Sequence, residues 1–252
     1  MLLLIDAGNT LVKWAIAAQG AGRDAKWSDH GAVAHADIPS LHKRWQTRGG
    51  RRPIRRVLIS NVAGDDVQSR LERLLADLNP DSIEWFKSKP SLAGVQNGYV
   101  DFAQLGCDRF AAMVGARSLF PGHALIVATC GTATTIDAVT SEGTFVGGMI
   151  LPGLKLMTAA LAKNTAQLPQ ISGSNLESSL FADNTDSAIA AGCIAAQAGA
   201  IERAVAEHEK TSVSVQCVLS GGAAPFISPH LSTPHRIVDN LVLIGLHTSA
   251  TG

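Results

Sequence analysis

The sequence predicts an α/β fold built from two similar halves, and two observations carry this prediction. Short apolar runs typical of buried strands alternate with segments of helical periodicity along the chain. In addition, a strand, a turn of small residues and a second strand follow one another at residues 2–16 and again at residues 125–139. A repeat of this kind about half a chain apart indicates two related domains.

The first copy of the repeat begins with the apolar run Leu2–Ile5, which is typical of a strand buried on both faces. The run stops at Asp6, so a carboxylate is expected where a core strand meets solvent. The small residues 7–10 predict a tight turn, and large apolar residues alternate with others over 11–16. Such a turn can bring backbone N–H groups close to a phosphate, while the acid can hold magnesium through water. An ordinary hairpin that ends in polar residues fits this stretch equally well.

The second copy of the repeat shifts the balance toward phosphate binding. The apolar run 125–127 leads into a turn rich in small and hydroxyl residues, which contains Gly131 and Thr132, and then into another strand. Two such hairpins on opposite walls would hold one polyphosphate from both sides. The sequence therefore favours a ligand that carries phosphate groups.

The composition points to a small-molecule partner. The chain has 252 residues, a formal net charge of zero, 46% hydrophobic residues and 5% aromatic residues, so we expect a sizeable aliphatic core in one large domain or two of ordinary size. A neutral chain gives no electrostatic reason to expect nucleic acid or an anionic membrane as partner. A small soluble ligand fits better.

The cysteines and the apolar runs indicate a cytoplasmic protein. The four cysteines are widely spaced and form no C-x-x-C pair, and Cys193 and Cys217 fall at apolar positions typical of packed thiols. The apolar run at the start is too short for a signal peptide, and no run is long enough to cross a bilayer.

The remainder of the first half predicts one polar stretch with functional character. A strand is expected over 57–59, a helix over 67–78 and a strand over 83–86. Residues 91–109 are then polar, glycine-bearing and irregular, and long irregular stretches in compact domains are often functional. A helix is expected to start at Asp108, which would lie at or beside its N-cap. Capping alone would explain a carboxylate there, so a catalytic interpretation needs further support.

The second half continues the alternation of strands and helices. Glycines at 147, 148 and 153 predict a close approach of the backbone to a ligand or a neighbouring element. The other expected elements are a helix beginning at Leu154, a helix over 187–209, a strand over 213–219, a closing segment from 237 and a final helix over 240–249.

Taken in order, these motifs resemble the type III pantothenate kinases, which belong to the superfamily of acetate and sugar kinases, Hsp70 and actin. The resemblance spans nearly the whole chain, and each motif alone would be weak. The motifs are residues 6–10, 97–99, 106–109, 131–137, 147–148 with 152–153, and 184–185.

The resemblance implies a fold and an assembly. The fold would have two ribonuclease-H-like, actin-like ATPase domains with the nucleotide cleft between them. The expected boundaries are 1–118 and 119–252, and the C-terminal helix could pack back on the first domain. The resemblance also implies a homodimer whose contact helps to shape the pantothenate pocket.

The implied activity is phosphorylation of pantothenate by ATP to 4'-phosphopantothenate, the first step of coenzyme A biosynthesis. By resemblance, ATP binding falls to Thr132 and to Asp6, Ala7, Gly8, Asn9, Thr10, Leu11, Val12 and Lys13. Asp6 would hold Mg²⁺ through water. Asp108 resembles the base that accepts the proton of the substrate hydroxyl, and geometry matters more to that role than a resting pKa. The pantothenate site would comprise Tyr99, Gly106, Cys107, Asp108, Arg109 and Thr185, with Arg109 as a partner for a carboxylate or an amide.

One position departs from the family pattern. The family usually has an aspartate two residues before the glycine of the second hairpin, where it helps to bind an activating monovalent cation, K⁺ or NH₄⁺. Thr129 occupies this place. A threonine can coordinate weakly but brings no charge, so a potassium requirement does not follow from the resemblance.

Two alternatives remain open at this point. One is a kinase of the same superfamily with a different small acceptor, against which residues 106–109 and Tyr99 weigh. The other is an ATP-binding regulatory protein without turnover. Asp6 and Asp108 argue against this second alternative, whereas Thr129 argues slightly for it.

Overall fold

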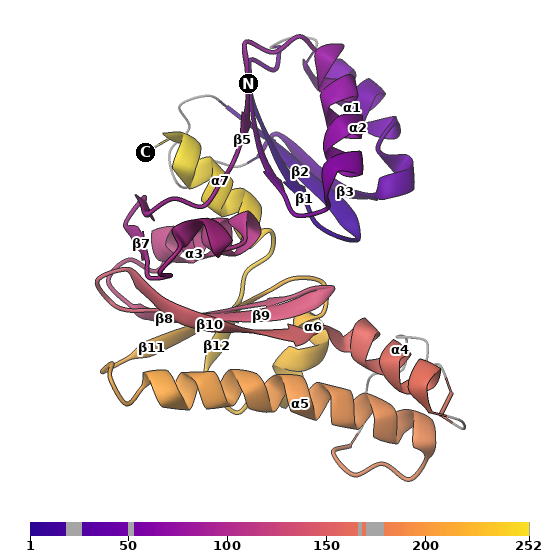
Figure 1. Cartoon of the computed structure of the whole chain (residues 1–252), viewed down its shortest axis with the longest axis vertical. Coiled ribbons are helices and arrows are strands. Elements are labelled where there is room, and N and C mark those ends of the chain that lie inside the picture. Colours follow the sequence, from indigo (N-terminus) through magenta and orange to yellow (C-terminus); the bar gives the residue numbers. More distant parts are fainter. Residues whose placement is uncertain (19–26, 50–52, 166–167, 170–178, 252) are drawn as a thin grey trace. The chain divides into compact units, whose positions relative to one another are not determined.

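The computed structural model describes residues 1–18, 27–49, 53–165, 168–169 and 179–251. These residues form two compact units (Figure 1). Unit 1 comprises Met1–Leu119 together with Asn240–Gly252, and unit 2 comprises Phe120–Asp239.

Unit 1 contains a five-stranded mixed sheet in the order β3-β2-β1-β4-β5. The pairs β1–β2 and β2–β3 are antiparallel, whereas β4 lies parallel to β1 and β5 parallel to β4. The strands are β1 (Leu2–Ala7), β2 (Leu11–Ala17), β3 (Asp29–Ala34), β4 (Arg56–Asn61) and β5 (Ser82–Trp85).

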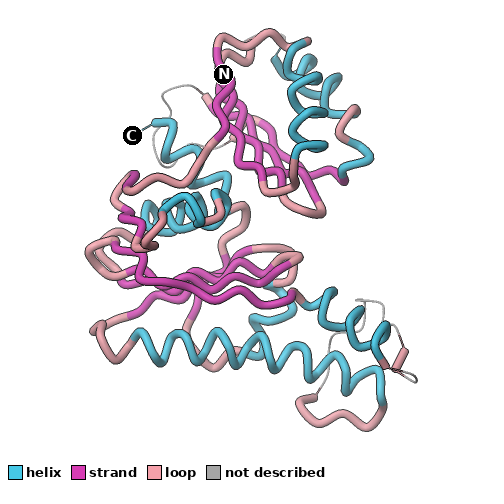
Figure 2. Tube along the Cα trace, in the orientation of Figure 1, coloured by secondary structure: helices cyan, strands magenta, loops and turns pink. Residues whose placement is uncertain are grey.

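Unit 2 repeats the same topology in the same chain order. The strands of both units are magenta in Figure 2. Those of unit 2 run in the order β10-β9-β8-β11-β12, with two antiparallel pairs followed by two parallel ones. They are β8 (Ala124–Cys130), β9 (Ala133–Val139), β10 (Thr144–Pro152), β11 (Val215–Ser220) and β12 (His235–Ile237). Two copies of this mixed sheet confirm the predicted α/β repeat and are the ribonuclease-H-like arrangement.

Helices cover the sheets within each unit (Figure 1). Unit 1 has α1 (Ser40–Gly49), α2 (Asp65–Ala76), α3 (Cys107–Leu119) and α7 (Leu241–Thr251). Unit 2 has α4 (Leu154–Asn164), α5 (Thr185–His208) and the short α6 (Ala224–Ile227). Three 3₁₀ turns occur among the described residues, η1 (His35–Asp37), η2 (Phe102–Gln104) and η3 (Ser228–His230).

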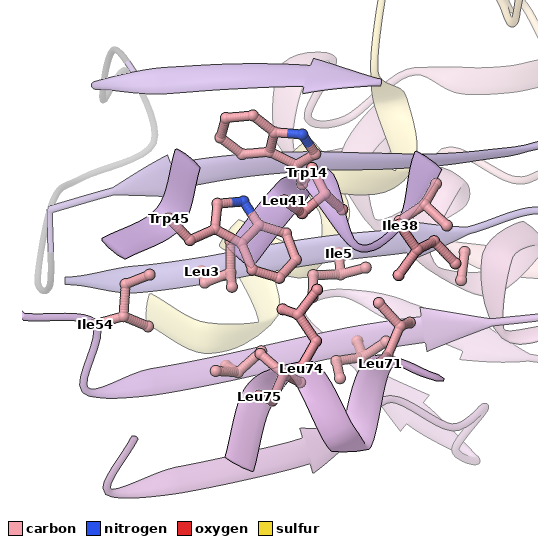
Figure 3. Packing of buried hydrophobic residues seen from close by; sticks show 14 of the residues in the cluster. Leu3, Ile5, Trp14, Ile38, Leu41, Trp45, Ile54, Leu71, Leu74 and Leu75 are labelled. Carbon is pink, nitrogen blue, oxygen red and sulfur yellow. The ribbon is translucent and has the colours of Figure 1, made fainter. Parts of the chain in front are cut away.

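The core of unit 1 lies between its sheet and the helices α1 and α2 (Figure 3). Trp14 of β2 meets Trp45 of α1 edge to face, with ring centroids 6.0 Å apart and an interplanar angle of 76°. Both side chains are fully buried. Such an aromatic pair adds about 0.5–1.5 kcal/mol beyond the area that it buries. This core holds β1 and β2 rigidly, and with them the turn that joins the two strands.

The core of unit 2 is formed largely by the sheet and α5. The buried side chains Ile189, Cys193 and Ile201 of α5 pack against those of β8 and β11. By length and composition alone, α5 could also cross a membrane, and it is the only such helix among the described residues. Its packing into the unit 2 core is that of a core helix in a globular unit.

The helix α3 is held against α7 by two glycines. A Cβ at Gly115 of α3 would meet the Leu241 carbonyl oxygen, and a Cβ at Gly245 of α7 would meet the Ala111 carbonyl oxygen. The two helix backbones therefore lie in direct contact, and any larger residue at either position would push them apart. Since α3 begins at Cys107, this contact fixes the segment that contains Asp108.

Several expected boundaries differ from the structure. Residues 91–109 are less irregular than predicted, because they contain the hairpin strands β6 (Ser91–Leu92) and β7 (Val95–Asn97) as well as η2. The strand expected over 213–219 begins at Val215, and Val213 is fully exposed. The closing segment expected from 237 overlaps the end of β12.

Candidate active site

The first part of the site lies where β1 and β4 end. These strands are parallel, so their carboxyl ends reach the same edge of the sheet, which is where ligands of open α/β sheets bind. Asp6 of β1 is in register with Ser60 of β4 on one side and with Lys13 of β2 on the other. A carboxylate, a buried hydroxyl and an ammonium group are thus placed on adjacent strands.

The turn after Asp6 is closed by its own backbone. The N–H of Gly8 donates to the carbonyl of Leu11 at 3.1 Å, and the N–H of Val62 donates to the carbonyl of Ala7 at 3.0 Å. Asn9 and Thr10 are exposed at the tip. The predicted ATP-binding residues 6–13 therefore belong to one hydrogen-bonded hairpin.

The helix α3 begins beside the ends of β1 and β4. The thiol of Cys107 lies 3.3 Å from the Ser60 hydroxyl and donates to the Asn61 carbonyl, with its sulfur 3.6 Å from that oxygen. Burial is the main cause that raises the pKa of this thiol, so the group stays protonated. Cys107 is one of the residues predicted to bind substrate, and its thiol contacts β4. It ties the first turn of α3 to the strand end.

Asp108 is the second residue of α3, and its carboxylate is half-buried. Its Oδ1 accepts the N–H of Arg109 at 2.8 Å. A Cβ at Gly106 would stand 2.7 Å from this same oxygen. The glycine therefore provides the space that the carboxylate occupies.

The carboxylate of Asp108 lies close enough to Asp6 to affect its charge state. Burial, followed by the nearby charge of Asp108, raises the pKa of Asp6 to about 7, although the Lys13 ammonium opposes the shift. Burial also raises the pKa of Asp108, against the opposing effects of the Arg109 N–H and its positive charge. Two acidic side chains that lie close together and are partly removed from water repel each other when both are ionised. Such a pair therefore favours the binding of a proton or a cation.

The Asp6 carboxylate fits a magnesium ion that keeps most of its waters. Magnesium in kinases is commonly held by one or two carboxylates together with substrate phosphates, rather than by a cage of side chains. In the described part of the chain, no group of three or more His, Cys, Asp or Glu side chains could hold a metal. Asp6 offers the hard oxygen that such an ion needs, and a cation there would offset the unfavourable charge of a half-buried acid.

Next to Asp108, Arg109 and Tyr99 form a pair. The guanidinium carbon lies 5.8 Å from the centroid of the Tyr99 ring, and Nη1 donates to the tyrosine hydroxyl at 3.3 Å. The side chain of Asn97 shapes the loop that carries Tyr99, because it accepts the Tyr99 N–H and donates to the Phe102 carbonyl. The predicted residues Tyr99, Gly106, Cys107, Asp108 and Arg109 thus lie together in unit 1.

In unit 2, the turn between β8 and β9 contains Thr132. Two glycines clamp this turn by close backbone approach. The N–H of Gly153 donates to the Thr132 carbonyl at 2.9 Å, and a Cβ at Gly221 would collide with the Cys130 carbonyl. The close approach predicted at Gly153 is confirmed. At Gly147, which has a positive φ of 144° beside a register shift in β10, no neighbouring element lies within 4 Å of the position that a Cβ would take, and the predicted approach of a ligand stays a prediction.

Thr129 lies in a row of hydroxyl residues across three strands. It is in register with Thr135 of β9 and with Ser220 of β11, so the three side chains share one face of the sheet. Among the described residues, the hydroxyls of Thr129 and Thr135 are buried without a hydrogen-bond partner. These are neutral oxygen donors, which a monovalent cation can use without a charged ligand.

Thr185 is the first residue of α5 and is exposed. The N-cap of this helix is Asn184, whose side chain accepts the Ser187 N–H at 3.0 Å. Of the predicted site residues, unit 2 thus contributes Thr129, Thr132 and Thr185.

Comparison with known proteins bears directly on this arrangement. The model of the type III pantothenate kinase family matches residues 2–207. A type III pantothenate kinase of Janthinobacterium sp. (strain Marseille) is 53% identical over 257 residues, covering 99% of this chain and 97% of that protein. The chain belongs to the type III pantothenate kinase family. As a member of this family, the protein is a kinase that phosphorylates pantothenate in coenzyme A biosynthesis, with ATP as the phosphoryl donor.

Solved structures agree with the fold of a member of this family. The chain is similar to a glucokinase from an Antarctic psychrotroph, with a TM-score of 0.55 and 11% identity over 98% of this chain and 97% of that one. It is also similar to a Campylobacter jejuni protein described as a candidate Baf family transcriptional activator. There the TM-score is 0.58 and the identity 18%, over 98% of this chain and 96% of that chain. At these identities the likeness concerns the fold alone, which is that of the sugar kinases and actin-like ATPases.

Sequence reasoning missed several residues that shape this candidate site. Ser60 and Asn61 follow the buried run of β4 just as Asp6 follows that of β1, so the rule for parallel strand ends could have found them. Gln197 is fully buried in α5 and donates to the Pro152 carbonyl at 2.6 Å, next to the glycine that clamps Thr132. No local pattern marks a glutamine in the middle of an alanine-rich helix.

Proposed function

We propose that Asp108 is the base through which the protein phosphorylates pantothenate. The observation that carries this assignment is the place of its carboxylate, at the start of α3 and close enough to Asp6 for their charges to interact. In the reaction, the substrate hydroxyl oxygen forms a bond to the γ-phosphorus of ATP as the bond from that phosphorus to the β–γ bridging oxygen breaks. ADP leaves, and the hydroxyl proton passes to Asp108.

The environment of Asp108 suits this role. A base works best when its pKa lies near the working pH, and burial shifts the pKa of Asp108 upward, toward that range. The hydrogen bond from the Arg109 N–H fixes the orientation of the carboxylate. Gly106, two residues before Asp108, leaves the carboxylate the space that a Cβ would fill.

Each of the two hairpin turns binds phosphate groups of ATP. The turn over residues 6–13 supplies backbone N–H groups and the Lys13 ammonium, and Thr132 supplies a hydroxyl from unit 2. Asp6 holds Mg²⁺ through water. When bound, this ion neutralises charge that develops on the phosphates during transfer. In this proposal the two units are the two ribonuclease-H-like domains of the family.

Pantothenate is held by the Tyr99 and Arg109 pair, by the backbone of residues 106–108 and by Thr185. The contact between the Arg109 guanidinium and the Tyr99 hydroxyl orients both groups, so the acceptor meets a preformed polar surface. The protein acts as a cytoplasmic homodimer in which the partner copy completes the pocket. Light scattering on purified protein measures the dimer directly.

The monovalent cation dependence follows from Thr129. The unpartnered hydroxyls of Thr129 and Thr135 can ligate K⁺ or NH₄⁺ weakly, but no charge comes from position 129. We therefore expect activity to depend less steeply on K⁺ than in a Thr129→Asp variant. Titration of K⁺ and NH₄⁺ against a sodium background compares the two. A steeper response in the unchanged protein would contradict the assignment.

A direct assay tests the activity itself. The purified full chain is incubated with ATP, Mg²⁺ and pantothenate, and mass spectrometry follows phosphopantothenate and ADP. We expect the two products in equal amounts, and none when pantothenate is omitted. If no phosphopantothenate forms with K⁺, with NH₄⁺ or without either, a nucleotide-binding role without turnover would replace this proposal.

A further inference from the structure

A histidine from outside the predicted site contacts the first phosphate turn. His35 lies in η1, which follows β3, and its Nε2 is 2.8 Å from the carbonyl oxygen of Gly8. The two residues are 27 positions apart in the sequence. The side chain is half-buried. This contact therefore joins the tip of the β1–β2 hairpin to a separate segment of unit 1.

The direction of this hydrogen bond follows from its acceptor. A carbonyl oxygen can only accept, so the proton must reside on Nε2 of His35. A neutral imidazole with its proton on Nε2 can donate, and so can the charged imidazolium. The contact is thus available in both protonation states of the ring.

The backbone of His35 is itself anchored. Its carbonyl accepts Nη1 of Arg70 from α2 at 3.4 Å, and it also accepts the Ile38 N–H at 3.4 Å. Arg70 forms an ion pair with Asp66 one turn earlier in α2, with 2.9 Å between Nη2 and Oδ2. The backbone that carries the imidazole is therefore held in place by hydrogen bonds from Arg70 and Ile38.

An anchored Gly8 carbonyl has a consequence for the next residue. The peptide that joins Gly8 and Asn9 is planar and trans, so its carbonyl and its N–H point in opposite directions. The bond from His35 holds the carbonyl on one side and thereby directs the Asn9 N–H to the other. Without it, rotation of this peptide in a glycine-containing turn is easy, and a carbonyl oxygen turned toward a phosphate would repel it.

We propose that His35 is a positioning residue for ATP binding, which holds the Gly8–Asn9 peptide so that its N–H remains available to a phosphate oxygen. This inference rests on the proposed assignment of residues 6–13 to ATP. It adds a residue from outside the hairpin, and it predicts an effect on the nucleotide rather than on the acceptor.

The test compares His35→Leu with His35→Gln, whose side-chain amide can place a donor where Nε2 stands. Isothermal titration with the magnesium complex of a non-hydrolysable ATP analogue gives Kd, and steady-state kinetics give KM for ATP and for pantothenate. Loss of one hydrogen bond that orders the turn should weaken nucleotide binding about tenfold in His35→Leu. His35→Gln should recover most of this loss, and KM for pantothenate should stay within about twofold in both variants.

The matched control is His30→Leu, the same change at an exposed histidine of β3 in the same unit. It should bind the nucleotide as the unchanged protein does. Equal Kd values for His35→Leu and the unchanged protein would overturn the inference, and so would equal losses in His35→Leu and His35→Gln. Absence of nucleotide binding by the unchanged protein would overturn the ATP assignment and this inference together. Nucleotide binding without pantothenate turnover would overturn the activity alone, because the titration still decides the role of His35.

Discussion

Oδ1 of Asp108 lies 2.7 Å from the point where a Cβ would stand at Gly106. The nearest obstacle to a methyl group at position 106 is thus the end of one movable side chain, the proposed base. Gly106→Ala should therefore move the carboxylate and leave the fold intact. We expect kcat to fall more than about tenfold, since small misplacement of a reacting group is costly, while the free energy of unfolding changes by less than about 1 kcal/mol.

Kinetics and chemical denaturation of Gly106→Ala separate these two effects. The control is Gly192→Ala in α5, where a Cβ would meet no atom within 4 Å. It should keep full activity and gain some stability, because alanine is the better helix former. Unchanged kcat in Gly106→Ala would show that the position of the carboxylate does not limit the rate.

Replacement of the proposed base gives a second prediction. Asp108→Asn keeps the size of the side chain and an oxygen that can accept the Arg109 N–H, so the fold should persist. The amide cannot take up a proton, and we expect kcat to fall by about 10²–10⁴-fold with little change in KM for ATP. Asp101→Asn is the matched control, because an asparagine can still accept the Ala103 N–H there. Comparable rate losses in both variants would point to a loop effect instead of proton transfer.

Much of this site could be predicted because sequence patterns mark the ends of strands. The uninterrupted apolar run before Asp6 and the alternation of Val12, Trp14 and Ile16 predicted the first hairpin, and all three alternating side chains are fully buried. A similar pattern, an apolar run followed by a turn of small residues, predicted the second hairpin. The structure confirmed both strand pairs because local hydrophobic periodicity and the global fold agree in them.

Contacts between segments that are distant in the sequence could not be predicted from it. The bond between His35 and Gly8 joins segments with no shared pattern, and the contact of Gly245 with the Ala111 carbonyl depends on the packing of α7 against α3. Gly147 shows a further limit. It has a positive φ at a register shift of β10, a backbone need that a sequence pattern does not distinguish from close packing.

The raised pKa of Asp6 predicts how the ligand-free protein responds to pH. The folded state binds this proton more tightly than the unfolded chain does. The contribution of Asp6 to the free energy of unfolding is therefore largest below about pH 4. That contribution is lost as pH rises from about 4 to about 7, where the carboxylate ionises in the folded protein. The shift from 3.8 to about 7 corresponds to at most about 4 kcal/mol, and solvent contact at this half-buried group reduces it to about 2 kcal/mol.

Asp6→Asn should accordingly stabilise the protein at pH 8 in the presence of a chelator, by about 1–3 kcal/mol, and should abolish turnover. Urea denaturation of both proteins at pH 5 and pH 8 measures the difference. Addition of Mg²⁺ should stabilise the unchanged protein at pH 8 and leave the variant unaffected. If the variant were less stable than the unchanged protein at pH 8, ionised Asp6 would have to be stabilising, contrary to this account.

The contact between α3 and α7 gives the last prediction. A methyl group at Gly245 would overlap the backbone carbonyl of Ala111, which cannot move without displacing α3 as a whole. We expect Gly245→Ala to cost about 1–3 kcal/mol of unfolding free energy, as overpacking of a close contact does, and to lower kcat because the helix that carries Asp108 shifts. Gly199→Ala in α5, where a Cβ meets open space, is the control for a glycine within a helix and should be neutral or stabilising. Full stability together with full activity in Gly245→Ala would mean that the two helix backbones can separate without moving the base.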